Sequence, residues 1–354
     1  MILPTTYLAA LLLSIVSMIC WGSWANTQKL AGKWRFELFY YDYSLGVLLC
    51  AGIAALTFGS WLPKELTFTD NLLIASNHQM AYAVGAGIVF NLANMLLVAA
   101  ITVSGLAVAF PIAIGLALVI GVIWNYILNP QADPILLFGG ALLVAAAIIV
   151  DAFAYGTYLE AQQAAAVRAL QPDPRTKTKN PKRGPGAARG IVLSIVSGLL
   201  MGAFYPIVEI SKQGDNGVSP YGVAVLFGAG VFLSSLVYIP FFLNFPVVGE
   251  PLKTADYFKG SVRQHVLGLL GGLIWMAGGL ANFIASSTPQ KVQVGPAVSY
   301  AIGQGATMVS ALWGLLVWRE FKGASHRVQL LLVVMMVLFL SGLGMISIAP
   351  LHAK

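Results

Sequence analysis

The chain has 354 residues, of which 58% are hydrophobic and only 9% are charged, and its formal net charge is +7. A soluble domain carries about 25% charged residues. The composition therefore argues against a soluble enzyme, a secreted disulfide scaffold, a disordered protein and a nucleic-acid binder. It indicates a polytopic membrane protein, in which excess lysine and arginine mark the loops that face the cytoplasm.

Ten apolar segments follow one another along the chain, each near the roughly 20 residues that a helix needs to cross a bilayer core. The predicted spans are 5–28, 38–59, 79–101, 105–128, 134–155, 189–212, 219–243, 265–287, 292–317 and 327–349. The first is expected to stay in the membrane as a span. It has no basic residue before Lys29, and its apolar run is longer than that of a cleavable signal peptide. The predicted fold is an all-α integral membrane protein.

The basic residues divide unevenly between the two faces that ten spans would create. One face holds both termini and carries 4 of the 20 lysines and arginines, whereas the loops of the other face carry 16. The positive-inside rule then places the central loop in the cytoplasm and both termini outside, in the cell (inner) membrane. Contacts with membrane lipid follow from this location.

The chain reads as two similar halves joined by a polar segment. Residues 1–159 form the first predicted five-helix repeat, 160–188 a basic cytoplasmic linker, and 189–354 the second repeat. The word Leu13–Ser17 recurs identically as Leu193–Ser197. Because five is odd, the second copy must enter the membrane from the opposite side. Inverted repeats of this kind build alternating-access transporters, with the substrate site near the midplane.

Asp42 is a carboxylate in the second predicted span, where a charged group is costly. One interpretation is a proton-coupling residue or a substrate acceptor. The other is a carboxylate at the headgroup boundary, paired with Lys29, Lys33 or Arg35. The sequence leaves these two open.

Glu209 lies near the end of the sixth predicted span, after Pro206. It is the second candidate for proton coupling. Lys212 follows it at a spacing of three residues on the same helical face, so an intrahelical ion pair is the plainer explanation.

Uncharged polar and aromatic residues concentrate in the first, third, eighth and ninth predicted spans. Amides supply donors and acceptors, and indole and phenol rings stack on flat ligands. For each residue alone, interhelical hydrogen bonding worth about 0.6 kcal/mol is the plainer explanation. Together they predict a cavity for a neutral polar metabolite, with the candidate substrate-binding residues Trp21, Trp24, Asn91, Asn94, Trp275, Asn282, Tyr300 and Gln304.

Several motifs are absent. The chain has no GxxxxGK[ST] phosphate loop, so ATP-driven transport is not indicated. Its four histidines lack the spacing of metal ligands. The sequence also shows no pairing of a nucleophile with a base that would indicate an intramembrane hydrolase. We expect no enzymatic activity, no cofactor and no metal.

At this point the sequence resembles the drug/metabolite transporter superfamily of ten-helix carriers, and more narrowly the ureide permease family. The features that carry the resemblance are Trp21–Trp24, Tyr41–Tyr43, Asn94, Asn125-Tyr126, Gln304 and the stretch from Trp313 to Phe321. The resemblance implies a secondary carrier, coupled to protons, for ureides such as allantoin or nucleobases such as uracil. It assigns Asp42, Asn94 and Gln304 to the site.

The rhamnose–proton and glucose porters share the same plan, which makes a sugar the main alternative substrate, and a drug or metabolite exporter is a further one. Plant ureide permeases carry a Walker-A-like motif in a longer central loop, and this chain has none. The leading hypothesis is a proton-coupled importer in which Asp42 or Glu209 takes a proton from outside. Whether the protein acts as a monomer or a homodimer stays open.

Overall fold

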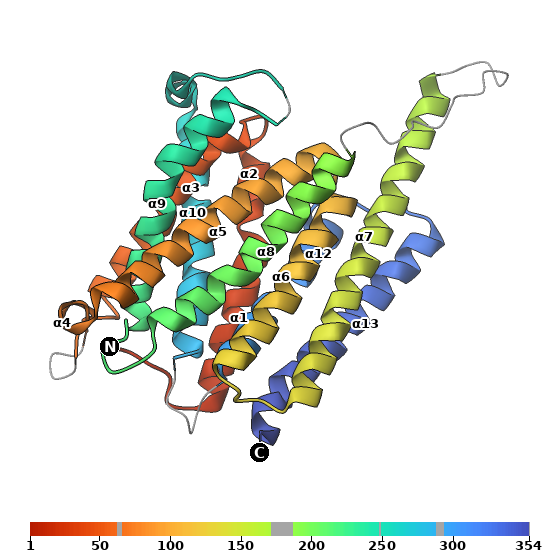
Figure 1. Cartoon of the computed structure of the whole chain (residues 1–354). Helices are drawn as coiled ribbons and strands as arrows, with labels where there is room; N and C mark the ends of the chain where they lie inside the picture. The colour runs from red at the N-terminus through yellow and green to blue at the C-terminus, as the bar shows by residue number, and fades with distance from the viewer. Residues whose placement is uncertain (62–65, 171–186, 248, 288–293, 354) are drawn as a thin grey trace.

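Apolar helices make up most of the chain, as the computed structural model shows for residues 1–61, 66–170, 187–247, 249–287 and 294–353 (Figure 1). Water is absent from a bilayer core, so a helix, which satisfies its own backbone groups, is the fold expected of such segments. Within these described residues no strand occurs.

The first half contributes seven helices. They are α1 (Tyr7–Ser23), α2 (Ala25–Ala31), α3 (Phe36–Leu56), α4 (Phe68–Ile74), α5 (Asn77–Ser104), α6 (Leu106–Leu128) and α7 (Pro134–Leu170). Helices α5 and α6 meet at Gly105, whose φ of 80° permits the sharp reversal between them.

The second half contributes α8 (Ala187–Ser211), α9 (Pro220–Asn244), η1 (Thr254–Lys259), α10 (Val262–Ala285), α11 (Pro296–Gly303), α12 (Ala306–Leu312), η3 (Trp313–Val317), α13 (His326–Ile348) and η4 (Ala349–His352). Serine side chains cap the starts of α9, α10 and α13, and Pro220 follows the first of these caps. Both are ordinary helix-start signals.

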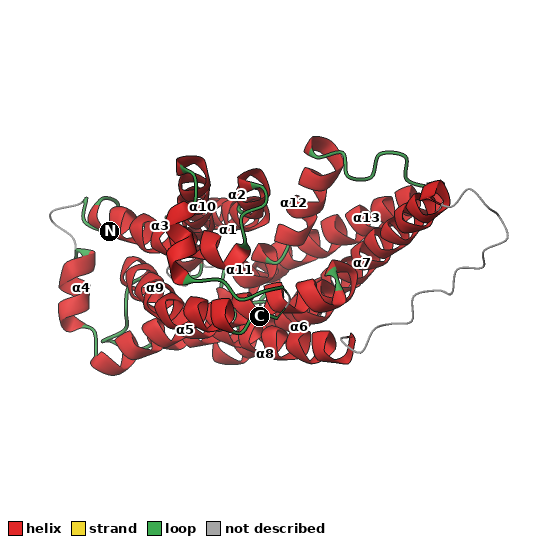
Figure 2. Ribbon diagram, turned by 90° about the horizontal axis from the view of Figure 1, so that it is seen from above, coloured by secondary structure: helices red, strands yellow, loops and turns green. Residues whose placement is uncertain are grey.

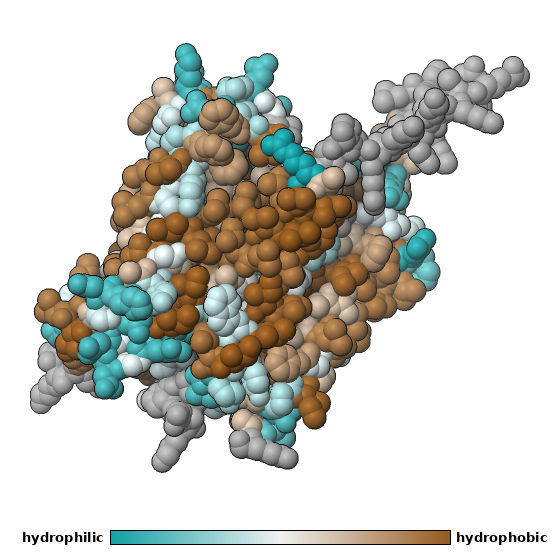
Figure 3. All heavy atoms as spheres, in the orientation of Figure 1, coloured by the Kyte–Doolittle hydropathy of each residue, from teal (hydrophilic) through white to brown (hydrophobic). Residues whose placement is uncertain are grey.

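The described residues contain ten helices long and apolar enough to cross a membrane, which confirms the predicted number of spans. Apolar side chains cover the middle of the visible face, and hydrophilic ones gather toward its two ends (Figure 3). One boundary differs by more than a few residues. Helix α7 continues to Leu170, into the segment predicted as a linker, and residues 171–186 of that segment lie outside the described residues.

Both termini lie at the same end of the bundle (Figure 1). The Ile2 amide donates to Phe58, just past α3, and the Ala349 carbonyl accepts from Asp133, just before α7. We call this the terminal end. The opposite end, which holds the predicted basic loops 29–35, 253–263 and 319–327, is the basic end.

The helices pack in interlocking pairs. Helix α8 lies against α5 and α6, α10 against α3 and α1, and α9 against α3 and α5, while α7 and α13 pair at one edge of the bundle (Figure 2). Small residues allow this close approach. Because lipid is as apolar as the helices, close packing rather than the hydrophobic effect holds them together.

The closest backbone approach joins α3 and α10. A Cβ atom added to Gly272 would lie 2.0 Å from the Tyr43 carbonyl oxygen and 2.9 Å from the Gly46 Cα. These are backbone atoms, so neither helix accommodates a side chain here without moving.

We predict that Gly272→Val separates α10 from α3 and lowers the free energy of unfolding by about 1–3 kcal/mol, the usual cost of overpacking. Thermal unfolding of the purified protein checks this. Gly52→Val on α3 is the matched control, since a Cβ there meets nothing within 4 Å. Equal losses in both variants would show that the close contact is not what matters.

Candidate functional site

Two spans are interrupted in their interior, and the interruptions face each other. Helix α1 gives way to α2 at Trp24, and α11 gives way to α12 at Gln304–Gly305. The two use the same local bond, because the hydroxyls of Thr27 and Thr307 donate to the carbonyls of Trp24 and Gln304, three residues earlier in each case.

The interrupted spans also bond to each other. The Ser310 hydroxyl donates to the Gly22 carbonyl at 2.9 Å, and the Trp313 indole donates to the Ser23 hydroxyl at 2.9 Å. Interrupted helices at membrane depth are tolerated where they line a cavity or are buried in protein.

A cavity of about 180 Å3, the central pocket, lies where these interruptions meet. Its lining comes from α1, the α1–α2 junction, α5, α6, α8, α10 and the α11–α12 region. The lining residues are Trp21, Trp24, Ala25, Phe90, Asn94, Leu97, Phe110, Ile114, Met201, Phe204, Trp275, Gly303, Gln304, Ala306, Thr307 and Ser310. None of them is charged.

Six of the sixteen lining residues are aromatic. Trp275 stacks with Trp21 at a centroid distance of 5.8 Å and lies 4.3 Å from the Phe90 ring. The Trp21 indole also donates to the Trp275 carbonyl at 3.2 Å. The Trp24 ring packs against the Tyr43 ring at a centroid distance of 4.9 Å. These contacts hold flat rings at the cavity rim in fixed positions.

The polar lining residues are two amides, Asn94 and Gln304, and the hydroxyl residues Thr307 and Ser310. The Asn94 amide nitrogen donates to the Tyr40 hydroxyl at 3.0 Å, which orients its head group. The Gln304 side chain, 8% exposed, makes no hydrogen bond within the described residues. An amide that is nearly buried and has no protein partner in the described chain is available to a ligand.

Three other candidate residues lie in helix packing. Asn91 donates to the Val231 carbonyl and to the hydroxyls of Ser234 and Ser235 on α9. The Tyr300 hydroxyl donates to backbone carbonyls of α6 and α8.

Asn282 bonds to Ser17, the Ser299 carbonyl and Tyr205. For these three residues the sequence allowed either interhelical hydrogen bonding or ligand binding. The structure shows interhelical hydrogen bonds.

Asp42 lies at the basic end with neither Lys29, Lys33 nor Arg35 as its partner. Its carboxylate accepts a hydrogen bond from the Tyr257 hydroxyl at 2.6 Å and lies 2.8 Å from the His265 Nδ1. Burial and the adjacent Asp42 carboxylate raise the pKa of Tyr257 above its usual value. Tyr257 therefore remains a donor at physiological pH.

The basic end is also tied together by charged and polar contacts between the first and ninth spans. Lys29 forms an ion pair with Glu320 and lies 4.3 Å from the centroid of the Trp318 ring. Trp318 in turn donates to Asn26 at 2.6 Å. The ion pair is part-exposed and contributes little stability by itself, but the set links α2 to the segment that follows η3 at this end.

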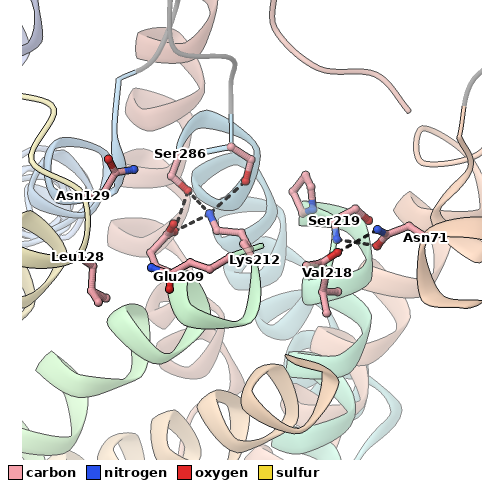
Figure 4. Close-up of a pocket in the computed structure, with 12 residues that line it drawn as sticks. Asn71, Leu128, Asn129, Glu209, Lys212, Val218, Ser219 and Ser286 are labelled. Atoms are coloured by element: carbon pink, nitrogen blue, oxygen red, sulfur yellow. Dashed lines mark hydrogen bonds and ion pairs between the residues drawn. The ribbon is translucent and has the colours of Figure 1, made fainter. Parts of the chain in front are cut away.

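Glu209 and Lys212 form an ion pair at 2.5 Å, as their spacing predicted. They lie at the terminal end in a second cavity, the terminal pocket, of about 370 Å3 (Figure 4). Lys212 also donates to the hydroxyls of Ser286 and Ser287 at 2.7 and 3.0 Å, and Ser286 donates to Glu209 at 3.0 Å.

Sequence reasoning missed several partners. His265 and Tyr257 were not associated with Asp42, nor Ser286 with Glu209, because each comes from a distant element and has no motif of its own. Within the described residues no group of three or more His, Cys, Asp or Glu side chains is placed to hold a metal ion.

We predict that Asn282→Ala lowers the free energy of unfolding by about 1–3 kcal/mol, because it leaves buried partners without hydrogen bonds. Gln304→Ala is the matched comparison and should leave stability nearly unchanged, since Gln304 bonds to nothing in the described chain. Thermal unfolding without ligand measures both. A larger loss for Gln304→Ala would contradict the distinction between packing and cavity amides.

Comparison with known proteins gives a consistent relationship. The sequence profile of the ureide permease family matches residues 39–183. Ureide permease 2 of Arabidopsis thaliana is 23% identical over 398 aligned residues, which cover 98% of each chain. Ureide permease 1 of the same plant is 23% identical over 402 residues, covering 98% of this chain and 97% of its own.

A crystal structure of another protein shares the fold. It superposes with a TM-score of 0.59 at 18% identity, over 96% of this chain and 97% of that one. The chain is thus similar to ureide permeases along nearly its whole length, and its ten apolar helices make it a multi-pass membrane protein.

Proposed function

We propose that the protein is a ureide permease: a secondary transporter that imports a small neutral nitrogen-rich compound, such as allantoin or uracil, through the central pocket. The observation that carries this proposal is the uncharged pocket, walled by aromatic rings and provided with two amides, at the junction of two interrupted spans. The named ureide permeases that align over the full chain support the same class of substrate.

The pocket chemistry suits a flat solute with alternating N–H and C=O groups. The Asn94 and Gln304 amides each offer both a donor and an acceptor. A ring held between Trp21, Trp24 and Trp275 gains stacking contacts while its polar edge reaches the amides. A charged solute would meet no opposite charge in the pocket lining.

An inverted repeat is part of the proposal, and several contacts support it. Gly46 on α3 meets Gly272 on α10, and Gly230 on α9 meets Gly87 on α5. When the first half is matched to the second, Gly46 corresponds to Gly230. Gly87 corresponds to Gly272 at nearly the same sequence offset. Both pairs are close backbone contacts between corresponding spans.

The repeated word Leu13–Ser17 gives a second correspondence. Ser14 and Ser194 each donate to the carbonyl four residues earlier. Ser17 accepts from Asn282 on α10, and Ser197 donates to the Ala93 carbonyl on α5, so each copy bonds to the third span of the other half. Alternating access then follows from rocking one half against the other around the central pocket.

The proposed transport is also coupled to protons. The described helices hold two buried carboxylates, Asp42 and Glu209, in hydrogen-bonded clusters at opposite ends of the bundle. A buried carboxylate that gains and loses a proton changes the local charge and biases one facing state over the other.

We predict that Asn94→Ala and Gln304→Ala each weaken substrate binding by about tenfold, corresponding to the loss of a hydrogen bond worth about 1.4 kcal/mol. A binding titration of the purified protein with allantoin, uracil and monosaccharides measures this. Asn91→Ala, on the same helix, is the control. It should lower stability while leaving affinity unchanged, because Asn91 bonds to α9. Binding of a sugar alone would replace the proposed substrate class.

We also predict that an inward proton gradient drives substrate accumulation in proteoliposomes. A variant that neutralises the coupling carboxylate should lose this accumulation while retaining exchange of preloaded substrate, since exchange needs no net proton movement. Asp42→Asn and Glu209→Gln are to be compared side by side. Undiminished accumulation in both variants would refute coupling through a buried carboxylate.

A further inference from the structure

A chain of hydrogen-bonded side chains runs from Glu209 into the protein. The Ser286 hydroxyl donates to Glu209 at 3.0 Å, and the Tyr205 hydroxyl donates to Ser286 at 3.1 Å. The same Tyr205 proton has a second acceptor in the side-chain oxygen Oδ1 of Asn282, so it is donated to one of these two residues at a time. All four residues are buried, at 7% exposure or less. Tyr205 and Asn282 are completely shielded from water, whereas Glu209 and Ser286 line the terminal pocket.

The chain ends at the wall of the central pocket. The Asn282 amide nitrogen donates to the Ser299 carbonyl of α11 at 2.9 Å. It also lies 3.1 Å from where a Cβ of Gly303 would stand, and the same position is 2.6 Å from the Trp21 ring. Gly303 and Trp21 line the pocket, and Gln304 follows directly. A shift of the Asn282 amide therefore displaces the backbone at the point where α11 is interrupted.

One charged side chain, Lys212, contacts Glu209 among the described residues. Helices α5 and α6 pack against α8, and the first contributes only His78, which is exposed beside Tyr82, while the second has no charged residue. Asp215, in the loop after α8, is exposed.

The other described elements near Glu209 carry no charged side chain. Ser286 and Ser287 follow α10, and α9 has no charged residue. Among the described residues, the charge at this site is therefore set by Glu209 and Lys212 together.

We propose that Glu209 binds the coupling proton and that its charge state is transmitted to the central pocket through Ser286, Tyr205 and Asn282. This rests on the proposed proton-coupled transport and assigns it to the terminal end. The three connecting residues act by position and do not touch the substrate.

The proton step is simple. A proton from water in the terminal pocket binds a Glu209 oxygen and neutralises the carboxylate. Lys212 keeps its charge and its bonds to Ser286 and Ser287, so the site gains one positive charge. The carboxylic acid is a weaker acceptor than the carboxylate, so the Ser286 hydroxyl turns its proton from Glu209 toward the Tyr205 oxygen. The Tyr205 proton then no longer goes to Ser286 and is donated to the Asn282 Oδ1 instead. Loss of the proton restores the original set.

The test observes the pocket tryptophans directly. Full-length protein labelled with 5-fluorotryptophan is titrated with acid, and the 19F resonances of Trp21 and Trp275 are followed, each assigned by a Trp→Phe variant. In the wild type we expect a pH-dependent shift without any substrate. In Glu209→Gln, which mimics the protonated form, and in Tyr205→Phe, which lacks only the connecting hydroxyl, the shift should disappear.

Tyr300→Phe is the matched control. Tyr300 is also fully buried, its ring lies 5.1 Å from that of Tyr205, and its hydroxyl bonds to backbone carbonyls outside the chain. It should keep the wild-type shift. A shift that persists in Tyr205→Phe, that is absent from the wild type, or that vanishes equally in Tyr300→Phe would overturn the proposal. Should Tyr205→Phe fail to fold, Ser286→Ala interrupts the same chain.

Binding gives the second readout. The affinity of the wild type for allantoin or uracil should change by about fivefold or more across the same titration, the lower range of allosteric coupling. In Tyr205→Phe the affinity should stay constant. If neither compound binds while the resonances behave as expected, the substrate class is wrong and the link between Glu209 and the pocket is upheld. Binding that changes with pH equally in wild type and Tyr205→Phe would refute the link alone.

Discussion

Backbone groups cannot be left without partners in a bilayer core, and this constraint determines where the protein departs from regular helix. Its two interrupted spans bond to each other through Ser310 and Ser23, and a threonine closes each interruption. These two interruptions lie where the helices surround a cavity, and the ninth span departs from regular α-helix once more at η3. The lining of the central pocket, its aromatic walls and its amides all depend on this local exception.

Helix α10 connects the Asp42 cluster, the central pocket and the Glu209 site. Its N-terminal part carries His265 against Asp42 at the basic end, its middle carries Trp275 in the pocket wall, and Ser286 just after it reaches Glu209 at the terminal end. Glycine faces hold the helix close to α3 and α1. A helix packed through small residues and held at each end by a titratable cluster is well suited to carry a change from one end of the bundle to the other.

Much of the fold was predictable from the sequence, because apolar length decides the number of spans. The candidate site was predictable only in part. Trp24, Asn94 and Gln304 line the central pocket, whereas Asn91 and Tyr300 face neighbouring helices. These spans are apolar on all sides, so the sequence does not indicate how each helix is rotated about its axis. The partners of Asp42 come from elements more than 200 residues away, which no local pattern reveals.

The absence of charge among the residues that line the central pocket has an electrical consequence. A neutral solute in an uncharged pocket adds nothing to the charge that crosses the membrane when the halves exchange. Any current that accompanies transport would then be carried by the coupling ion alone. Because each elementary charge moved through 100 mV contributes about 2.3 kcal/mol, the membrane potential would act on accumulation in proportion to the number of ions coupled. The current per molecule of substrate would therefore report the stoichiometry directly.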